Sequence, residues 1–439
     1  MKKSLFALAA VTAFAGAAQA QSSVTVYGIL DLGYVGSNVR VANNSGTNAL
    51  VNTQNSQFGQ GGESTNRLGF KGTEDLGGGL SAFFTIETEI TPNATNTVST
   101  GAAANRQTFA GLKKSGIGQF ALGTQYTAIH NAVAATDPGQ ANNMAGNVIY
   151  DKLSGGSALT TSTMVGTNGS AGSQQFSGQQ NNSSYTVRAN NMLSVASDTF
   201  AGFQGNAFFV LNDQNTNSAS VTSTGGGYAG GTTNHTGWGL GGNYTWNKLL
   251  VTANFQQFTD KAPYGVTSAG VYQAGNPTQG GFIGTTTVGV NDKDNQQYYA
   301  ATYDFGILKA YAQYVNRKTL DANNPNNYVA RTAEQIGVRS FITPTVEAWA
   351  SAGMGKITVS QGAASSLALV SASGVGSNAG NFGGFQLGSN YWLSKRTNLY
   401  AIYGQQRTSN QVYNTTGGVA GNPTSYNLNN YALGVRHTF

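Results

Sequence analysis

The sequence predicts an all-β protein, a 16-stranded antiparallel transmembrane β-barrel, and three observations support this fold class. Charged residues make up only 9% of the 439 positions, against about 25% in ordinary globular chains. No apolar run reaches the roughly 20 residues that a membrane-spanning helix needs. Segments of about ten residues alternate apolar with polar or small residues, which is the period of a strand. Because a sheet in hydrocarbon must leave no edge unpaired, such strands are expected to close into a barrel.

The first twenty residues predict a secretory signal peptide. Lys2 and Lys3 precede an apolar run that begins at Leu5, and Ala18 and Ala20 form a small-residue cleavage site around Gln19. Residues 1–20 are therefore expected to be removed, and residues 21–439 to form a single barrel domain outside the cytoplasm.

The segments 238–246, 249–256 and 308–317 show the two faces of the predicted strands most clearly. In the first of them, Trp238, Leu240, Tyr244 and Trp246 lie on one face, and Gly, Asn and Thr lie on the other. A soluble β-sandwich also alternates, but it has loops of similar length at both ends. The polar second face indicates a water-filled lumen, which sixteen strands are wide enough to enclose.

The connectors between the predicted strands differ systematically in length. Seven are short, around residues 74–75, 114–116, 197–198, 247–248, 304–306, 343–345 and 394–396. Eight long stretches alternate with them, at about 38–63, 89–104, 128–183, 212–235, 259–295, 318–328, 358–381 and 407–425. Seven turns and eight loops join sixteen strands, and short turns at one end with long loops at the other are typical of outer-membrane barrels.

The residue types exclude several other classes of protein. Cysteine is absent, and the three histidines, His130, His235 and His437, are scattered along the chain, so no metal site, cofactor or catalytic group is predicted. The formal charge of +6 includes the two lysines of the predicted leader, which leaves +4. This charge is too small and too dispersed for a nucleic-acid partner.

The last predicted strand has an apolar face that continues to the end of the sequence. Its residues are Tyr431, Leu433, Val435, His437 and Phe439. An ordinary edge strand is the alternative, but terminal residues are usually polar and frayed.

Four short motifs stand out along the chain: residues 23–28 (SVTVYG), 66–77 (NRLGFKGTEDLG), 105–112 (NRQTFAGL) and 434–439 (GVRHTF). In these motifs the sequence resembles the general porins of Gram-negative bacteria, and most of all the β-proteobacterial porin family. The resemblance covers essentially the whole chain. It implies a homotrimer embedded in outer-membrane lipid and lipopolysaccharide, with a third loop folded into each barrel. It also implies that the barrel-assembly machinery recognises Phe439, with Val435, Leu433 and Tyr431 on the same face.

The resemblance places the basic ladder of the family's pore constriction on Arg67, Arg106 and Arg188. The alternation agrees, since each arginine is out of phase with apolar residues that follow it, namely Leu68 and Phe70, Phe109, and Leu193 and Val195. All three are therefore expected to face the lumen. The alternative is that an arginine extends toward the membrane rim.

The third loop is expected to begin after residues 126–127 and to carry acidic residues opposite this ladder. Asp137 is the candidate, and Asp151 is a second one. The sequence departs from the family at Thr124, where many relatives have Arg, and it lacks the Pro-Glu-Phe-Gly-Gly motif of some general porins.

Further charged residues have the phase of the lumen face. The basic ones are Lys309, Arg317, Arg331, Arg339 and Arg436, and the acidic ones are Glu87, Asp304 and Glu347. Because a narrow constriction concentrates ions of opposite charge, the excess of basic residues predicts a modest preference for anions. The expected function is a channel for passive transport of small hydrophilic solutes and ions.

Three other functions remain as alternatives. A substrate-selective channel for sugars or organic anions would use lumen-facing aromatic residues such as Tyr298, Tyr311 and Trp349, which are not contiguous in one register. An outer-membrane hydrolase would need a Ser–His pair, and neither His130 nor His235 lies in a well-defined strand. An adhesin is disfavoured because no loop is long enough for a passenger domain.

Overall fold

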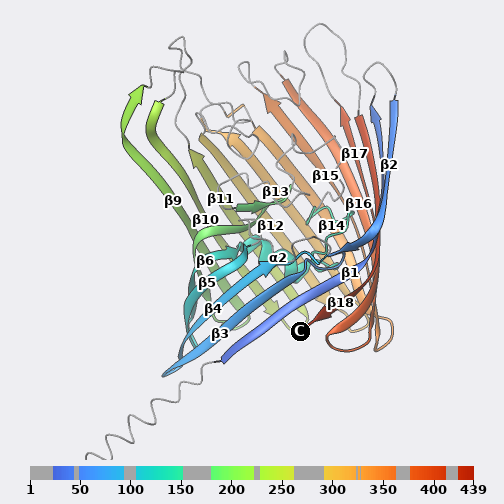
Figure 1. Ribbon diagram of the computed structural model, residues 1–439, viewed down its shortest axis with the longest axis horizontal. Coiled ribbons are helices and arrows are strands. Elements are labelled where there is room, and N and C mark those ends of the chain that lie inside the picture. The colour runs from blue at the N-terminus through green and yellow to red at the C-terminus, as the bar shows by residue number, and fades with distance from the viewer. Residues whose placement is uncertain are drawn as a thin grey trace, which may run out of the picture.

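The computed structural model describes residues 23–43, 49–92, 105–151, 179–221, 228–261, 291–322, 325–326, 328–361, 376–411 and 424–439. These residues form one antiparallel sheet that curves round into a barrel, with the last strand beside the first (Figure 1). The predicted signal peptide and the centres of most predicted long loops lie outside the described residues.

The strands tilt around the barrel, and they are numbered in chain order in Figure 1. The first half contains β1 (Ser23–Asn43), β2 (Ala49–Gln60), β3 (Arg67–Gly77), β4 (Leu80–Glu89), β5 (Asn105–Lys114), β6 (Gly118–Tyr126), β7 (Gln179–Asn181), β8 (Thr186–Ser197) and β9 (Phe203–Val221). The second half contains β10 (Tyr228–Trp246), β11 (Leu249–Lys261), β12 (Asn291–Asp304), β13 (Lys309–Asp321), β14 (Tyr328–Phe341), β15 (Val346–Gln361), β16 (Gly376–Trp392), β17 (Thr397–Gln411) and β18 (Thr424–Thr438). One helix, α2 (Ala128–Thr136), follows β6.

The barrel wall contains sixteen strand positions, as predicted. The long strand β1 pairs with β2 along residues 32–43 and with β3 along residues 23–29, so β2 and β3 together occupy one position. The three-residue strand β7 pairs with β8 beside the wall. Pairing of β1 with β18, from Ile29 opposite Thr438 to Ala42 opposite Ser425, closes the cylinder.

The seven short turns lie where the sequence predicts them, with one shift. Glu74 and Asp75 are still part of β3, which ends at Gly77, and the first turn falls on Gly78 and Gly79. The φ angles of Gly77, Gly78 and Gly79 are +84°, +59° and +76°, a left-handed conformation that glycine adopts without steric cost. The strands at the other end extend further than predicted: β9 and β10 occupy most of the predicted loop 212–235. Their polar ends carry no hydrophobic alternation that would mark them as strands.

The two faces of the wall have opposite chemistry. Trp238, Leu240 and Trp246 on β10 are exposed on the outside, whereas Asn254 and Gln256 on the neighbouring β11 are buried on the inside. This is the reverse of a soluble protein and suits a wall between lipid and water. Among the described residues, no helix has the length and apolar character needed to cross a membrane.

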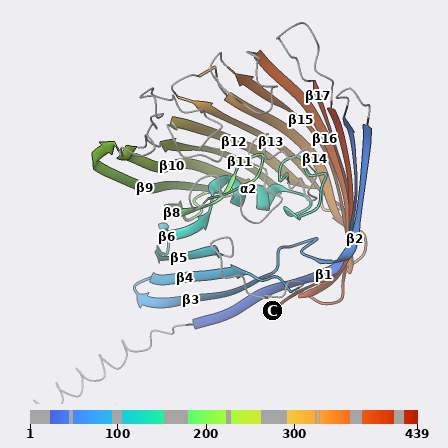
Figure 2. The ribbon, with the colours of Figure 1, turned by 45° about the horizontal axis from the view of Figure 1, so that its top comes forward.

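The segment after β6 leaves the wall and enters the barrel, where Figure 2 shows α2 inside the ring of strands. Thr127 caps the helix: its Oγ1 accepts from the backbone N–H of His130 at 3.3 Å, and it donates to the carbonyl of Thr186 at 2.6 Å. Ile129 and Val133 on α2 are fully buried in an apolar cluster with residues of the returning chain and of the wall. We refer to residues 127–151 and 181–185 together as the inward segment.

Candidate functional site

Two arginines on the lumen face of the wall share one carboxylate. Nε of Arg106 on β5 donates to Oε1 of Glu87 on β4 at 2.7 Å, and Nη1 of Arg67 on β3 lies 3.7 Å from the same oxygen. The other oxygen of Glu87 accepts from Oη of Tyr27 at 3.0 Å. Glu89, two residues further along β4, lies opposite Arg67 and is a second carboxylate in this part of the lumen.

Arg106 reaches the lumen because of a β-bulge and not because of simple alternation. Glu87 pairs with Gln107 and Thr88 pairs with Asn105, which leaves Arg106 as the extra residue on β5. Arg106 faces the lumen as expected, but the phase assigned to Phe109 was wrong. Phe109 does not lie on the lipid face; it lines a cavity inside the barrel. A bulge shifts the alternation by one residue and leaves no mark in the hydrophobic pattern.

Arg188 lies in the same region, next to Tyr126. Its guanidinium carbon is 5.6 Å from the centre of the Tyr126 ring, and Oη of Tyr126 accepts from Nη2 of Arg106 at 2.7 Å. The pairing of β8 with β6 is also irregular here, and Asn191 has a φ of +52°. The alternation is therefore interrupted between Arg188 and Leu193, and the outward direction of Leu193 does not predict the direction of Arg188. The structure thus gathers Arg67, Arg106 and Arg188 around Glu87 and Tyr126, and we call these five residues the arginine cluster.

Tyr126 was missed as a functional residue by the sequence reasoning. It is the last residue of β6, where the chain turns inward, and its ring lies 4.3 Å from that of His130 on α2. Alternation says nothing about a residue at the end of a strand. The contacts of Tyr126 with two arginines become visible only in three dimensions.

Asp137 does not present its carboxylate to the open lumen. It is buried, and its Oδ1 accepts from Nδ2 of Asn147 at 2.9 Å and from Nε2 of Gln335 on β14 at 3.0 Å. Its Oδ2 accepts from the backbone N–H of Ala141 at 2.7 Å. Burial raises the pKa of Asp137 to about 6, partly offset by these hydrogen bonds. The residue therefore anchors the inward segment to the wall.

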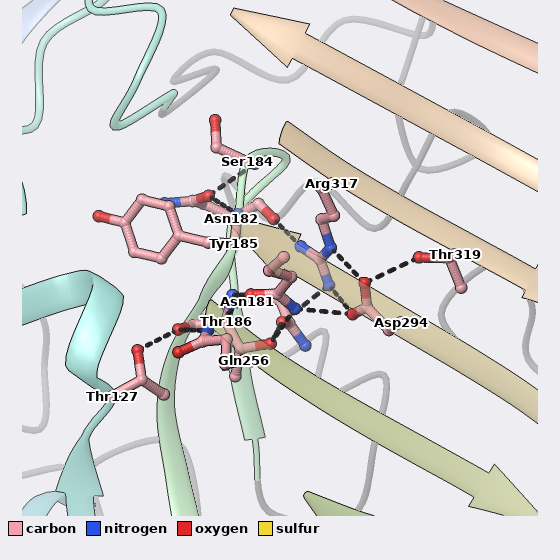
Figure 3. Close-up of polar contacts among 11 residues, drawn as sticks. Thr127, Asn181, Asn182, Ser184, Tyr185, Thr186, Gln256, Asp294, Arg317 and Thr319 are labelled. Atoms are coloured by element: carbon pink, nitrogen blue, oxygen red, sulfur yellow. Dashed lines mark hydrogen bonds and ion pairs between the residues drawn. The ribbon is translucent and has the colours of Figure 1, made fainter. Parts of the chain in front are cut away.

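Three arginines predicted to line the lumen are instead covered by the inward segment. Arg317 donates to the carbonyl of Asn182 at 2.8 Å, Arg331 to that of Val148 at 2.8 Å, and Arg339 to that of Pro138 at 2.7 Å; all three arginines are buried. Figure 3 shows Arg317 between Asn182 and Asp294. Their predicted phase was correct, but phase cannot tell which other part of the chain covers a face.

Each of these arginines also has an acidic partner. Nη2 of Arg317 lies 2.6 Å from Asp294, Nη2 of Arg331 lies 3.2 Å from Asp151, and Nη2 of Arg339 lies 2.6 Å from Glu347. Asp151 therefore faces the wall, as Asp137 does. We refer to Arg317, Arg331 and Arg339 as the docking arginines.

The remaining charged residues predicted for the lumen differ in position. Lys309 is half-buried with its Nζ 5.3 Å from the centre of the Tyr311 ring, and Arg436 is half-buried on β18 opposite Asp31 of β1. Asp304 is the exposed last residue of β12, in the phase of the buried Thr302, and it accepts from the backbone N–H of Gly306 at 2.7 Å.

The inward segment spans the barrel. Asn142 donates to Gln386 on β16 at 2.6 Å, and Nδ2 of Asn143 donates to the carbonyl of Gly61, between β2 and β3, at 2.7 Å. Helix α2 contacts the wall from β8 to β13. The segment therefore narrows the lumen and is held to the wall on both sides of it.

The last strand, β18, presents an apolar face on the outside of the barrel and pairs with β1. Tyr431, Leu433, Val435 and Phe439 are all exposed on the outside, and the ring of Phe439 packs over Gly28, where a Cβ would collide with it. The backbone N–H of Gly28 donates to the carbonyl of Phe439 at 3.1 Å.

A closed barrel with an apolar exterior, a polar interior and a segment folded into its lumen is an integral outer-membrane protein. The chain matches the family model of the Gram-negative porins over residues 7–411, and it belongs to this family.

Two curated relatives agree with this assignment. The chain is 36% identical to an outer membrane porin protein of Bordetella pertussis over 151 residues, which are 32% of this chain and 39% of the relative. It is 32% identical to outer membrane porin protein 32 of Delftia acidovorans over 218 residues, 49% of this chain and 51% of the relative. The chain thus matches about half or less of the length of each.

Two solved structures share the fold. An anion-selective porin from Comamonas acidovorans has a TM-score of 0.58 at 19% identity, covering 95% of this chain and all of that one. The trimer form of OmpT from Vibrio cholerae has a TM-score of 0.53 at 15% identity, covering 95% of this chain and 99% of that one.

Proposed function

We propose that the chain forms a water-filled channel for passive diffusion of small hydrophilic solutes and ions across the outer membrane, with a modest preference for anions. The observation that carries this proposal is the arginine cluster, in which Arg67 and Arg106 contact the carboxylate of Glu87 and Arg188 lies beside Tyr126. Glu89, opposite Arg67, is the second carboxylate of this region, so three guanidinium groups outnumber two carboxylates. A relative with a similar fold is an anion-selective porin, which supports the sign of the preference.

The size of the preference follows from which charges are compensated. The docking arginines are buried and paired with Asp294, Asp151 and Glu347, so they add little to the potential in the open lumen. The net charge of the arginine cluster remains, and it concentrates anions where the inward segment narrows the channel. Salt screens such charges within about 10 Å at 0.1 M, so the preference should weaken as the salt concentration rises.

Purified protein in a planar bilayer tests the channel itself. Stepwise single-channel currents that scale with the conductivity of the bathing salt are expected, since ions in a wide aqueous pore move much as they do in bulk. Failure to form such steps, with protein that still shows the β-sheet spectrum of the folded state, would contradict the channel.

We propose that the channel assembles as a homotrimer. The support is the similar fold of OmpT, which is known in a trimer form, and an aromatic patch of Tyr34, Phe58 and Tyr431 on the outside of β1, β2 and β18. Phe58 is 87% exposed in the single chain. Unheated detergent gels are expected to show a trypsin-resistant species near three times the heated mass, and a monomer in mild detergent by light scattering would contradict it.

Other parts of the proposal concern biogenesis. We propose that residues 1–20 are cleaved on export, that the exposed C-terminal face with Phe439 is recognised by the barrel-assembly machinery, and that lipopolysaccharide surrounds the long-loop end of the barrel.

A selective sugar channel based on Tyr298, Tyr311 and Trp349 has no support in the structure. All three side chains are buried, and Oη of Tyr298 lies 2.6 Å from Oγ1 of Thr136 at the end of α2. Trp349 packs with Met144 of the inward segment, so Tyr298 and Trp349 are both covered and the three rings do not form a continuous path along the lumen.

A further inference from the structure

A cavity of about 420 Å³ lies inside the barrel, between α2 and the wall formed by β5, β6 and β8–β11. We propose that this cavity is a binding subsite for a small neutral solute that carries several hydroxyl groups, the size of a monosaccharide or disaccharide. The proposal rests on the channel function, because the solute must reach the cavity through the lumen. The volume falls within the range of about 300–1,000 Å³ that is usual for small-molecule sites.

The chemistry of the lining favours a neutral ligand. Among the described residues that line the cavity, none is charged, and seven are Gln or Asn. A carboxamide both donates and accepts hydrogen bonds, as a hydroxyl group does. An ion would lose hydration there without meeting an opposite charge, and a purely apolar molecule would leave the amides without partners.

Part of the lining is one row of residues across three neighbouring strands. Gln119 on β6 lies opposite Ala196 on β8, which lies opposite Asn206 on β9. Two amides therefore flank a residue with a small side chain. Ala196 leaves space between them, and the amides border that space with polar groups.

Apolar side chains form the rest of the cavity lining. Phe109 on β5 and Phe208 on β9 contribute aromatic rings, and Ala132 on α2 contributes a methyl group. Apolar walls with a few placed polar groups are the usual composition of a small-molecule site, and aromatic faces pack well against the C–H surface of a pyranose ring. The cavity therefore matches a molecule with both hydroxyl groups and C–H faces.

The test measures single-channel conductance in a planar bilayer while D-glucose or sucrose is added. The wild-type conductance is expected to fall with sugar concentration along a saturating curve. A polyethylene glycol of similar hydrodynamic size should give only the gradual fall that viscosity and excluded volume produce.

The variant Gln119→Leu/Asn206→Leu removes two lining amides with little change in volume. Its half-saturating sugar concentration is expected to rise roughly tenfold or more, because each lost amide leaves a ligand hydroxyl without a partner. Gln57→Leu, at an exposed position on β2 outside the cavity, is the matched control and should leave the curve unchanged. An unchanged oligomer band on unheated gels checks the fold of each variant.

Sugar curves that coincide with those of the polyethylene glycol, or that are the same in the wild type and the double variant, would overturn the subsite. The zero-current potential in sugar-free salt separates this outcome from failure of the anion preference, since both substituted residues are neutral. A saturable sugar effect in a channel without anion preference would leave the subsite standing and contradict only the proposed selectivity.

Discussion

Arg106 donates from Nε to Oε1 of Glu87 at 2.7 Å, so a buried carboxylate on β4 holds a buried guanidinium that a β-bulge turns into the lumen. The same oxygen lies 3.7 Å from Nη1 of Arg67. Glu87 therefore both positions the two arginines and cancels part of their charge.

Replacing Glu87 by Gln is expected to increase the preference for anions, because it removes the carboxylate that both Arg67 and Arg106 contact. The zero-current potential in a salt gradient should shift further toward the anion limit, and the shift should grow as the salt is diluted. Asp304→Asn removes a carboxylate at an exposed turn and serves as the control. Equal potentials for Glu87→Gln and the wild type would show that this carboxylate does not act on the permeating ions.

The substitution Glu87→Gln is also expected to destabilise the barrel. Arg106 would remain buried without its acidic partner, and leaving one member of a buried ion pair alone costs about 3 kcal/mol or more. The midpoint of unfolding in denaturant, followed by the loss of heat-modifiable mobility on gels, should fall relative to Asp304→Asn. A midpoint equal to that of the control would contradict the role of Glu87 in holding Arg106.

Docking of the inward segment is expected to depend on pH through Asp137. Burial raises the pKa of this carboxyl from 3.8 to about 6. The raised value means that folding favours the protonated form, so the stabilising contribution is fully present below about pH 3.8 and is lost as the pH rises through about 6. Amides of residues 127–151 should therefore exchange more slowly at pH 5 than at pH 8, after correction for the intrinsic rate. In Asp137→Asn the difference should vanish, and its persistence in that variant would assign the effect to another group.

Arg331→Met is expected to loosen the inward segment. The guanidinium of Arg331 donates to the carbonyl of Val148 at 2.8 Å and to Oγ of Ser184 at 2.6 Å, and its loss also leaves Asp151 without this cationic partner. Conductance and current noise should both rise. Adding Asp151→Asn should recover part of the change, since it removes the buried charge that Arg331 compensated. Noise and conductance equal to the wild type in Arg331→Met would contradict the docking role.

Deletion of Phe439 is expected to reduce the amount of protein in the outer membrane with little change in synthesis. The ring packs over Gly28 and continues the exposed face of Tyr431, Leu433 and Val435. His437→Ala is the comparison, because His437 contacts Thr397 on the neighbouring strand and should matter less. Normal surface levels after the deletion would count against recognition of this face.

The fold was predictable from the sequence because a membrane wall imposes a strict rule on each strand. Lipid outside and water inside force an alternation that is visible in the segment from Trp238 to Trp246, and the turn residues mark one end of the barrel. The polar ends of β9 and β10 were missed because there both faces can be polar, so the alternation disappears.

The candidate site was less predictable, for two physical reasons. A bulge inverts the alternation at Arg106, so the phase of Phe109 pointed to the wrong face. The burial of Arg317 and Arg331 comes from the inward segment, and contacts between residues more than a hundred positions apart leave no periodic signal. The cavity likewise depends on Ala196 lying between Gln119 and Asn206 across strands.

The zero-current potential of the purified wild-type protein in a planar bilayer, under a potassium chloride gradient, tests the proposed selectivity most directly. An anion-selective potential is predicted, and Arg67→Gln should move it toward cations, more so in dilute salt, because Arg67 faces the lumen and is the more exposed member of its pair with Glu87. A cation-selective wild type, or a potential that Arg67→Gln leaves unchanged at every salt concentration, would contradict the account that the arginine cluster governs ion passage.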